Sequence, residues 1–69
     1  MAPATLAGEQ TPIALSEVPE TIRDIARGEL PDTRLISANT ETEAGGGYLY
    51  EIQGLLPSGR KVEFDIYPE

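Results

Sequence analysis

The chain has 69 residues with no cysteine and no histidine, and five basic against twelve acidic residues give it a formal net charge of −7. It therefore has no thiolate ligand, no disulfide, and no Ser-His or Cys-His nucleophile. Its acidity opposes nucleic-acid phosphates and anionic membranes, and favours cationic partners. We expect one small domain that is not an enzyme, has no cofactor, and neither binds nucleic acid nor inserts into a membrane.

The start of the chain is small, polar and without periodicity, which predicts a flexible tail over residues 1–10 and a single domain over 11–69. The short apolar stretch 11–15 follows. Because proline is tolerated at a sheet edge, Pro12 allows this stretch to be either a brief edge strand or a cover for the core. No export signal is visible, and the small residues after Met1 are compatible with a signal that has been removed.

A helix is predicted to begin near Ser16, where Ser16 or the residues just after it can serve as N-cap, and Gly28 and Pro31 are predicted to end it. Pro19 fits its first turn. Helical spacing places four apolar residues on one face, namely Val18, Ile22, Ile25 and Ala26. We expect this face to pack on a sheet.

Three strand-like runs follow over residues 34–42, 48–56 and 60–67, separated by loops of hairpin length. The second loop, 57–59, fits a three-residue hairpin, because proline starts a type I turn and glycine takes the left-handed position. Such a loop opposes Ile52 to Phe64 and Tyr50 to Ile66, which gathers the apolar side chains on one face. A two-residue loop would split them between the faces.

The first loop, counted as the five residues 43–47, sets the register of the other hairpin. It opposes Ala38 to Ile52 and Ile36 to Gly54. The predicted sheet core then comprises Ile36, Ala38, Tyr50, Ile52, Val62, Phe64 and Ile66. The expected fold class is α+β, with one N-terminal helix packed on an antiparallel β-meander of three strands, or of four if the 11–15 stretch pairs with it.

The same register predicts an acidic outer face, in which Glu51 lies opposite Asp65. Like charges directly opposed across strands cost up to about 1 kcal/mol, so this face is either a solvated surface that discourages aggregation or a docking surface. Its protein-binding candidates are Asn39, Glu41, Leu49, Glu51, Glu63, Asp65 and Tyr67, with Leu35 and Leu55 at the far end. No metal site is predicted, because two carboxylates supply too few of the roughly six to eight oxygens that calcium takes.

A second candidate surface is the glycine-rich loop with Gly45, Gly46 and Gly47. This loop is either a slack hairpin or a mobile segment that inserts into a partner's cleft. It is not a phosphate loop, because neither a Lys-Ser/Thr pair nor a helix follows it.

Several short motifs resemble the PepSY and PepSY-like domains. A helix opens at Leu15-Ser16-Glu17-Val18-Pro19 and closes at Gly28-Glu29-Leu30-Pro31-Asp32, and later runs contain Tyr48-Leu49-Tyr50-Glu51-Ile52 and Val62-Glu63-Phe64-Asp65-Ile66-Tyr67. The resemblance spans roughly residues 12–69 and implies a β-lactamase-inhibitor-like fold. It implies a periplasmic or secreted bacterial protein that restrains or chaperones a peptidase or contacts another envelope protein, without catalytic residues of its own. The alternative is a structural unit of a larger or homo-oligomeric assembly, and the cytoplasm is compatible with the lack of cysteine.

Overall fold

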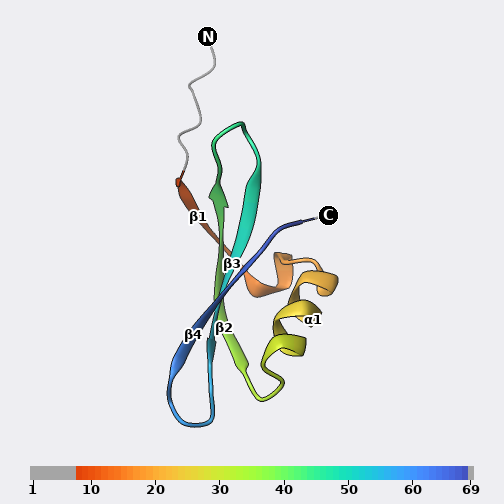
Figure 1. Cartoon of the computed structure of the whole chain (residues 1–69), viewed down its shortest axis with the longest axis vertical. Coiled ribbons are helices and arrows are strands. Elements are labelled where there is room, and N and C mark those ends of the chain that lie inside the picture. The colour runs from red at the N-terminus through yellow and green to blue at the C-terminus, as the bar shows by residue number, and fades with distance from the viewer. Residues whose placement is uncertain (1–7, 69) are drawn as a thin grey trace.

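The computed structural model describes residues 8–68, in which one α-helix packs on a four-stranded antiparallel sheet (Figure 1). The elements are β1 (Gln10–Ile13), the 3-10 turn η1 (Leu15–Glu17), α1 (Glu20–Glu29), β2 (Arg34–Thr42), β3 (Tyr48–Leu55) and β4 (Lys61–Ile66). The strands lie in the sheet in chain order, with η1 and α1 inserted between β1 and β2. The predicted α+β class is confirmed, and the apolar stretch after the start of the chain supplies the fourth strand.

The edge strand β1 begins earlier than expected. Gln10, which falls in the predicted tail, is its first residue and pairs with Glu41 of β2. The hydrogen bonding continues outward, since the Gly8 N–H donates to the Thr42 carbonyl at 2.7 Å. The remainder of the predicted tail, residues 1–7, lies outside the described residues.

The helix begins at Glu20 rather than near Ser16, so the predicted start is wrong. Ser16 lies in the η1 turn, and Pro19 is the N-cap residue of α1. Proline suits a helix start because it fixes φ and lacks the N–H that a helix interior needs. Val18, at the junction of the two helical segments, still belongs to the core, with only 1% of its surface exposed.

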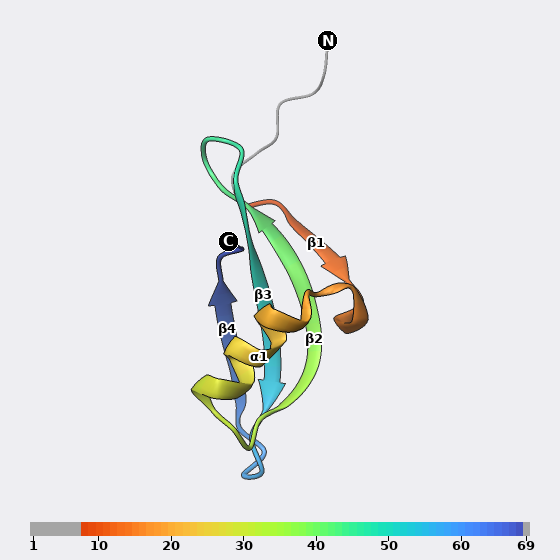
Figure 2. The same ribbon diagram turned by 90° about the vertical axis from the view of Figure 1, so that its right-hand side faces the viewer.

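The core lies between α1 and the sheet. Its buried members are Val18, Ile22, Ala26, Ala38, Tyr50, Ile52 and Phe64, and the partly buried Ile13, Leu15, Leu35, Val62 and Ile66 pack against them. One predicted helix residue is not among them, because Ile25 is 44% exposed. Figure 2 shows α1 crossing the sheet obliquely, with its C-terminal end reaching beyond the β4 edge.

The predicted register between β3 and β4 is confirmed at every pair, including Ile52 with Phe64 and Glu51 with Asp65. The turn that sets it is also as predicted. Gly59 has a φ of 88°, and its N–H donates to the Leu56 carbonyl at 2.9 Å, which closes a three-residue loop. Turn chemistry and strand alternation therefore agree in this hairpin.

The register between β2 and β3 is confirmed near the connecting loop, from Ala38 to Thr42, but not at the start of β2. Ala38 opposes Ile52 as predicted, whereas Leu35, not Ile36, opposes Gly54. The pairing shifts between Leu35 and Ser37, as at a β-bulge, and a one-residue shift moves side chains to the other face. Leu35 therefore packs against the core rather than on the outer face, and Ile36 is 39% exposed instead of buried.

The glycine-rich loop spans the predicted residues 43–47 between β2 and β3, and two hydrogen bonds tighten it. The Glu43 N–H donates to the Gly47 carbonyl at 2.7 Å, and the Gly46 N–H donates to the Glu43 carbonyl at 3.1 Å. These bonds leave three residues, 44–46, at the tip of the loop and repeat the pattern of the second hairpin. Gly45 and Gly46 have φ values of 95° and 93°, a region that side chains with a Cβ rarely adopt. The loop is therefore a closed turn rather than a slack one.

Candidate functional site

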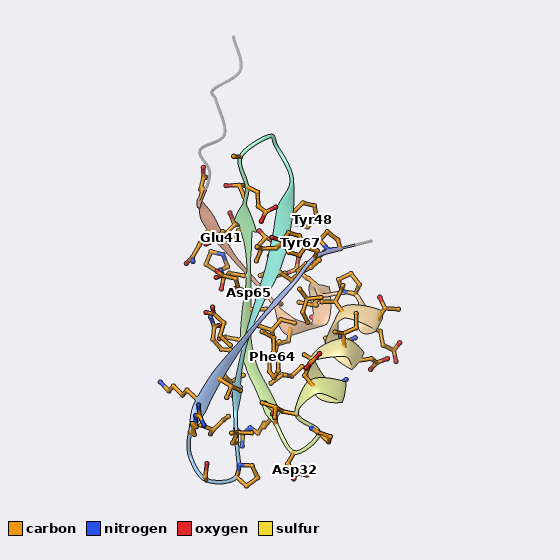
Figure 3. The ribbon with its side chains drawn as sticks, in the orientation of Figure 1. Asp32, Glu41, Tyr48, Phe64, Asp65 and Tyr67 are labelled. Carbon is orange, nitrogen blue, oxygen red and sulfur yellow. The ribbon has the colours of Figure 1, made fainter. Side chains whose placement is uncertain are left out.

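The candidate site is the sheet face opposite α1, which we call the acidic face and define as Asn39, Glu41, Leu49, Glu51, Glu63, Asp65 and Tyr67. Figure 3 shows Glu41 and Asp65 on the side of the sheet away from the helix. The register brings the central members together, because Asn39 and Asp65 both oppose Glu51 from the neighbouring strands. The predicted candidates thus share one face, contributed by β2, β3, β4 and the residue that follows β4.

Glu51 is the centre of the acidic face and is only 6% exposed, which the sequence did not indicate. Its Oε1 atom accepts hydrogen bonds from Asn39 Nδ2 at 2.7 Å and Gln10 Nε2 at 2.8 Å. Hydrogen bonds to charged groups contribute roughly 1.5–3 kcal/mol each. Two neutral amides therefore stabilise a buried carboxylate that faces other carboxylates. Gln10 was missed because it fell in the predicted tail, although extending the edge strand by one residue would have placed it here.

Glu63 joins the predicted Glu51–Asp65 pair, so the acidic face contains three clustered carboxylates. One oxygen from each of Glu51, Glu63 and Asp65 lies within 4.8 Å of the others. Partial desolvation raises the pKa of Glu63 above its usual value, and the negative charges of Asp65 and Glu51 raise it further. Three carboxylates remain fewer ligands than the roughly six to eight oxygens of a calcium site. The absence of a metal site stays a prediction.

The upper end of the acidic face is covered by a tyrosine. The Tyr67 hydroxyl donates to Glu43 Oε1 at 2.7 Å, which raises the pKa of the phenol because the tyrosinate would lose this bond and face a negative charge. Since β3 lies between β4 and β2, the Tyr67 side chain must pass over β3 to reach Glu43. Leu49 of β3, a predicted binding candidate, is only 5% exposed and so offers little surface to a partner.

The carboxylates of the acidic face have no cationic partner within residues 8–68. The one ion pair in that range joins Arg27 and Asp24 of α1 at 3.5 Å, at the i,i+3 spacing at which helix side chains meet. Lys61 is on β4 but opposes Leu55 at the far end of the sheet. Within the described residues, the negative charge of the acidic face is therefore uncompensated.

The glycine-rich loop does not extend the acidic face. Gly46 and Gly47 line a hollow on the α1 side of the sheet, together with Tyr48 and Tyr50. The two tyrosine rings meet edge to face, with centroids 5.5 Å apart. The two candidate surfaces predicted from the sequence are thus distinct, and only Glu43, at the base of the loop, reaches the acidic face through Tyr67.

A further surface, which the sequence did not predict, lies at the β4 edge. A hollow between the helix and this edge is lined by Ile25, Glu29, Leu30, Phe64, Asp65, Ile66 and Tyr67, and we call it the α1–β4 groove. Its apolar floor and walls adjoin carboxylates at the rim. Ile25, predicted to be buried, is 44% exposed and is one of the residues that line the groove.

Comparisons of the chain with protein-family models, curated proteins and solved structures find no match. The resemblance to PepSY domains therefore stays an expectation from the motifs. In the described part of the chain, no helix is long and apolar enough to cross a membrane. The fold and the site together define a small α+β protein with an acidic sheet face and an apolar groove at one sheet edge.

Proposed function

We propose that the chain is a non-enzymatic binding module that contacts a basic surface of another protein through its acidic face. One observation carries the proposal. The carboxylates of Glu41, Glu51, Glu63 and Asp65 share this face, and across residues 8–68 none of them is paired with a cation. A basic partner would supply the missing counter-charge and would be steered to the face by its field.

The rigidity of the face supports the same proposal. Glu51 is held by Asn39 and Gln10, and the surrounding side chains stand on three paired strands. A surface ordered before binding loses little conformational entropy when a partner docks. Ser37 Oγ donates to Gln53 Oε1, so this hydroxyl contacts an amide rather than a base that could activate it.

The resemblance to PepSY domains suggests what kind of partner this is. By that resemblance, the partner is a peptidase or another envelope protein that the chain restrains or chaperones in the periplasm or outside the cell. The net charge of −7 supports a partner with a basic contact surface.

Charge reversal tests the proposal. Glu63→Lys with Asp65→Lys reverses the exposed part of the acidic face, and Glu20→Lys with Asp32→Lys makes the same charge change at exposed positions elsewhere. We expect immobilised wild type and the Glu20/Asp32 variant to capture the same basic proteins from an envelope extract, with capture falling as salt is added. The Glu63/Asp65 variant should lose them. Equal capture by both folded variants, verified by circular dichroism, would contradict the proposal.

A second candidate function is a structural unit of a larger or homo-oligomeric assembly. The observation that favours it is that β4 pairs on one side only among residues 8–68, and unpaired edges recruit further strands. Sedimentation velocity separates this candidate from the first, because self-assembly makes the sedimentation coefficient rise with protein concentration. A coefficient that stays constant with concentration would argue against it.

A further inference from the structure

The free edge of β4 exposes backbone groups suited to another strand. In an antiparallel ladder, opposed pairs alternate between hydrogen-bonded and non-hydrogen-bonded. The Leu56 N–H donates to the Arg60 carbonyl at 2.9 Å, which makes this a bonded pair. Counting along β4, Val62 and Phe64 also bond to β3, whereas the N–H and C=O groups of Lys61, Glu63 and Asp65 point away from the sheet.

The two edges of the sheet differ in how well they are protected. β1 contains Pro12 and spans only four residues, features that discourage further pairing. β4 has six residues, contains no proline, and pairs with β3 without a register shift. The β4 edge is therefore the more regular of the two and the better suited to pairing with an added strand.

A strand added at β4 would place half of its side chains in the α1–β4 groove. Neighbouring strands lie about 4.8 Å apart, and the last turn of α1 extends beyond β4 (Figure 2). The new strand would thus run beneath the end of the helix. Side chains on its inner face would meet Ile25, Leu30 and Phe64, which line the groove. These contacts favour apolar residues at alternate positions of the added strand.

The other half of the side chains would lie beside the acidic face. Cross-strand neighbours stand about 5 Å apart, so they would adjoin Glu63 and Asp65 of β4. Basic residues at these positions would neutralise the carboxylates. A second copy of β4 fits less well, because it would bring its own Glu63 and Asp65 and a further charge of −7.

We infer that the β4 edge binds an extended segment of another protein in which apolar residues alternate with lysine or arginine. The segment adds as a fifth antiparallel strand, with its apolar residues in the α1–β4 groove and its basic residues beside Glu63 and Asp65. This inference rests on the proposed binding function and specifies the form of its partner.

A peptide of alternating lysine and valine, capped at both ends and long enough to span β4, tests the inference. We expect it to bind the full chain and to slow hydrogen exchange of the Lys61, Glu63 and Asp65 amides, measured by NMR. The Val62 and Phe64 amides, already bonded to β3, should change little. A peptide of the same composition with its lysines grouped at one end should bind at least about tenfold more weakly, since it cannot satisfy both faces at once.

Two variants probe the backbone and the groove separately. Glu63→Pro removes an outward N–H that β3 does not use, and should weaken binding about tenfold, whereas Glu63→Gln retains the N–H and should bind more tightly than Glu63→Pro. If Glu63→Pro does not fold, Ile25→Lys provides the test, because it places a cation in the groove at an already exposed position. Its matched control is Ile36→Lys, because Ile36 is 39% exposed, close to the 44% of Ile25, but lies on β2 rather than beside β4. This control should bind the peptide like the wild type.

Three outcomes would overturn the inference. If both peptides bind equally and reversal of Glu63 and Asp65 abolishes binding without any amide protection at β4, the acidic face binds cations but the edge does not, and the proposed function survives alone. If neither peptide binds, the edge does not recognise this chemistry. If the same amides become protected without peptide as protein concentration rises, the occupant is a second copy of the chain.

Discussion

At the scale of single residues, Glu51 is the residue on which the acidic face depends most. It is a buried carboxylate whose hydrogen-bond partners are amides rather than cations. Asn39→Ala removes one of its two donors while leaving the charge buried. We expect the free energy of unfolding to fall by about 1–3 kcal/mol, because a buried charged acceptor loses a hydrogen bond. Urea denaturation measures this change.

The control for Asn39→Ala is Ser37→Ala. Ser37 lies on the same strand and also bonds to a side chain of β3, but it is exposed and its partner, Gln53, is neutral. We expect its loss of stability to be less than about 0.5 kcal/mol. Equal effects of the two substitutions would mean that Glu51 does not depend on its amide partners.

Glu63 gives a prediction about pH. Its pKa in the folded protein is raised, so the folded state binds this proton more tightly than the unfolded chain, whose value is near 4.5. The free energy of unfolding should therefore decrease as pH rises from 4.5 through the folded pKa, because the unfolded state then releases the proton more readily.

The substitution Glu63→Gln tests this dependence. Glutamine cannot ionise, so the decrease in stability across this pH range should be smaller in the variant than in the wild type. At pH near 7 the variant should be more stable by less than about 1 kcal/mol, because it also removes a like charge facing Asp65 and Glu51. Urea denaturation from pH 4.5 to 7 measures both effects. Parallel stability curves for the two proteins would contradict the prediction.

At the scale of elements, β3 passes close to the segment that connects α1 to β2. A Cβ at Gly54 would run into the Cγ2 methyl of Thr33, a residue that is itself buried. Overpacking of this kind costs about 1–3 kcal/mol. We therefore expect Gly54→Ala to lower the melting temperature clearly.

The double variant of Gly54→Ala with Thr33→Ser tests that explanation, because serine lacks the methyl that clashes. We expect it to regain most of the lost stability, with a coupling energy of about 1 kcal/mol or more in a thermal double-mutant cycle. Simple additivity of the two substitutions would mean that the cost at Gly54 comes from its other neighbours, Arg34 and Val62, rather than from contact with Thr33.

The elements also show what could be predicted from the sequence. Both hairpin registers follow from loop length combined with apolar alternation, and they suffice to place Asn39, Glu51 and Asp65 together. The shift at Ile36 could not be predicted, because Leu35 and Ile36 are both apolar and either could face the core.

Other errors came from how elements are placed in space. Helical periodicity identifies an apolar stripe but not how much of it the sheet covers, and Ile25 is left 44% exposed. The role of Gln10 depends on a long-range pairing between β1 and β2, which a polar residue at the end of a short strand does not reveal. The candidate face was therefore predictable, whereas its hydrogen-bonded centre and the neighbouring groove were not.

At the scale of the whole molecule, charge imbalance should make stability depend on salt. The net charge is −7, and the ion pair between Arg27 and Asp24, the only one in the described residues, is well exposed and so contributes little. Repulsion among the carboxylates of the acidic face should therefore outweigh the attraction between oppositely charged side chains. Screening strengthens as the Debye length falls from about 30 Å at 0.01 M to about 8 Å at 0.15 M ionic strength.

We expect the melting temperature to rise by a few degrees, about 2–6 °C, when sodium chloride is increased from roughly 0.01 to 0.15 M, since about 1 kcal/mol corresponds to about 4–8 °C in a domain of this size. Glu63→Gln with Asp65→Asn should reduce this rise, because it removes two of the clustered charges. Glu20→Gln with Asp32→Asn removes the same net charge elsewhere and should reduce it less. If both variants reduce the rise in melting temperature equally, the repulsion comes from the net charge of the whole molecule rather than from the acidic face. If the wild-type melting temperature falls with salt, attractive ion pairs dominate, and the acidic face loses the uncompensated charge on which its proposed role in binding depends.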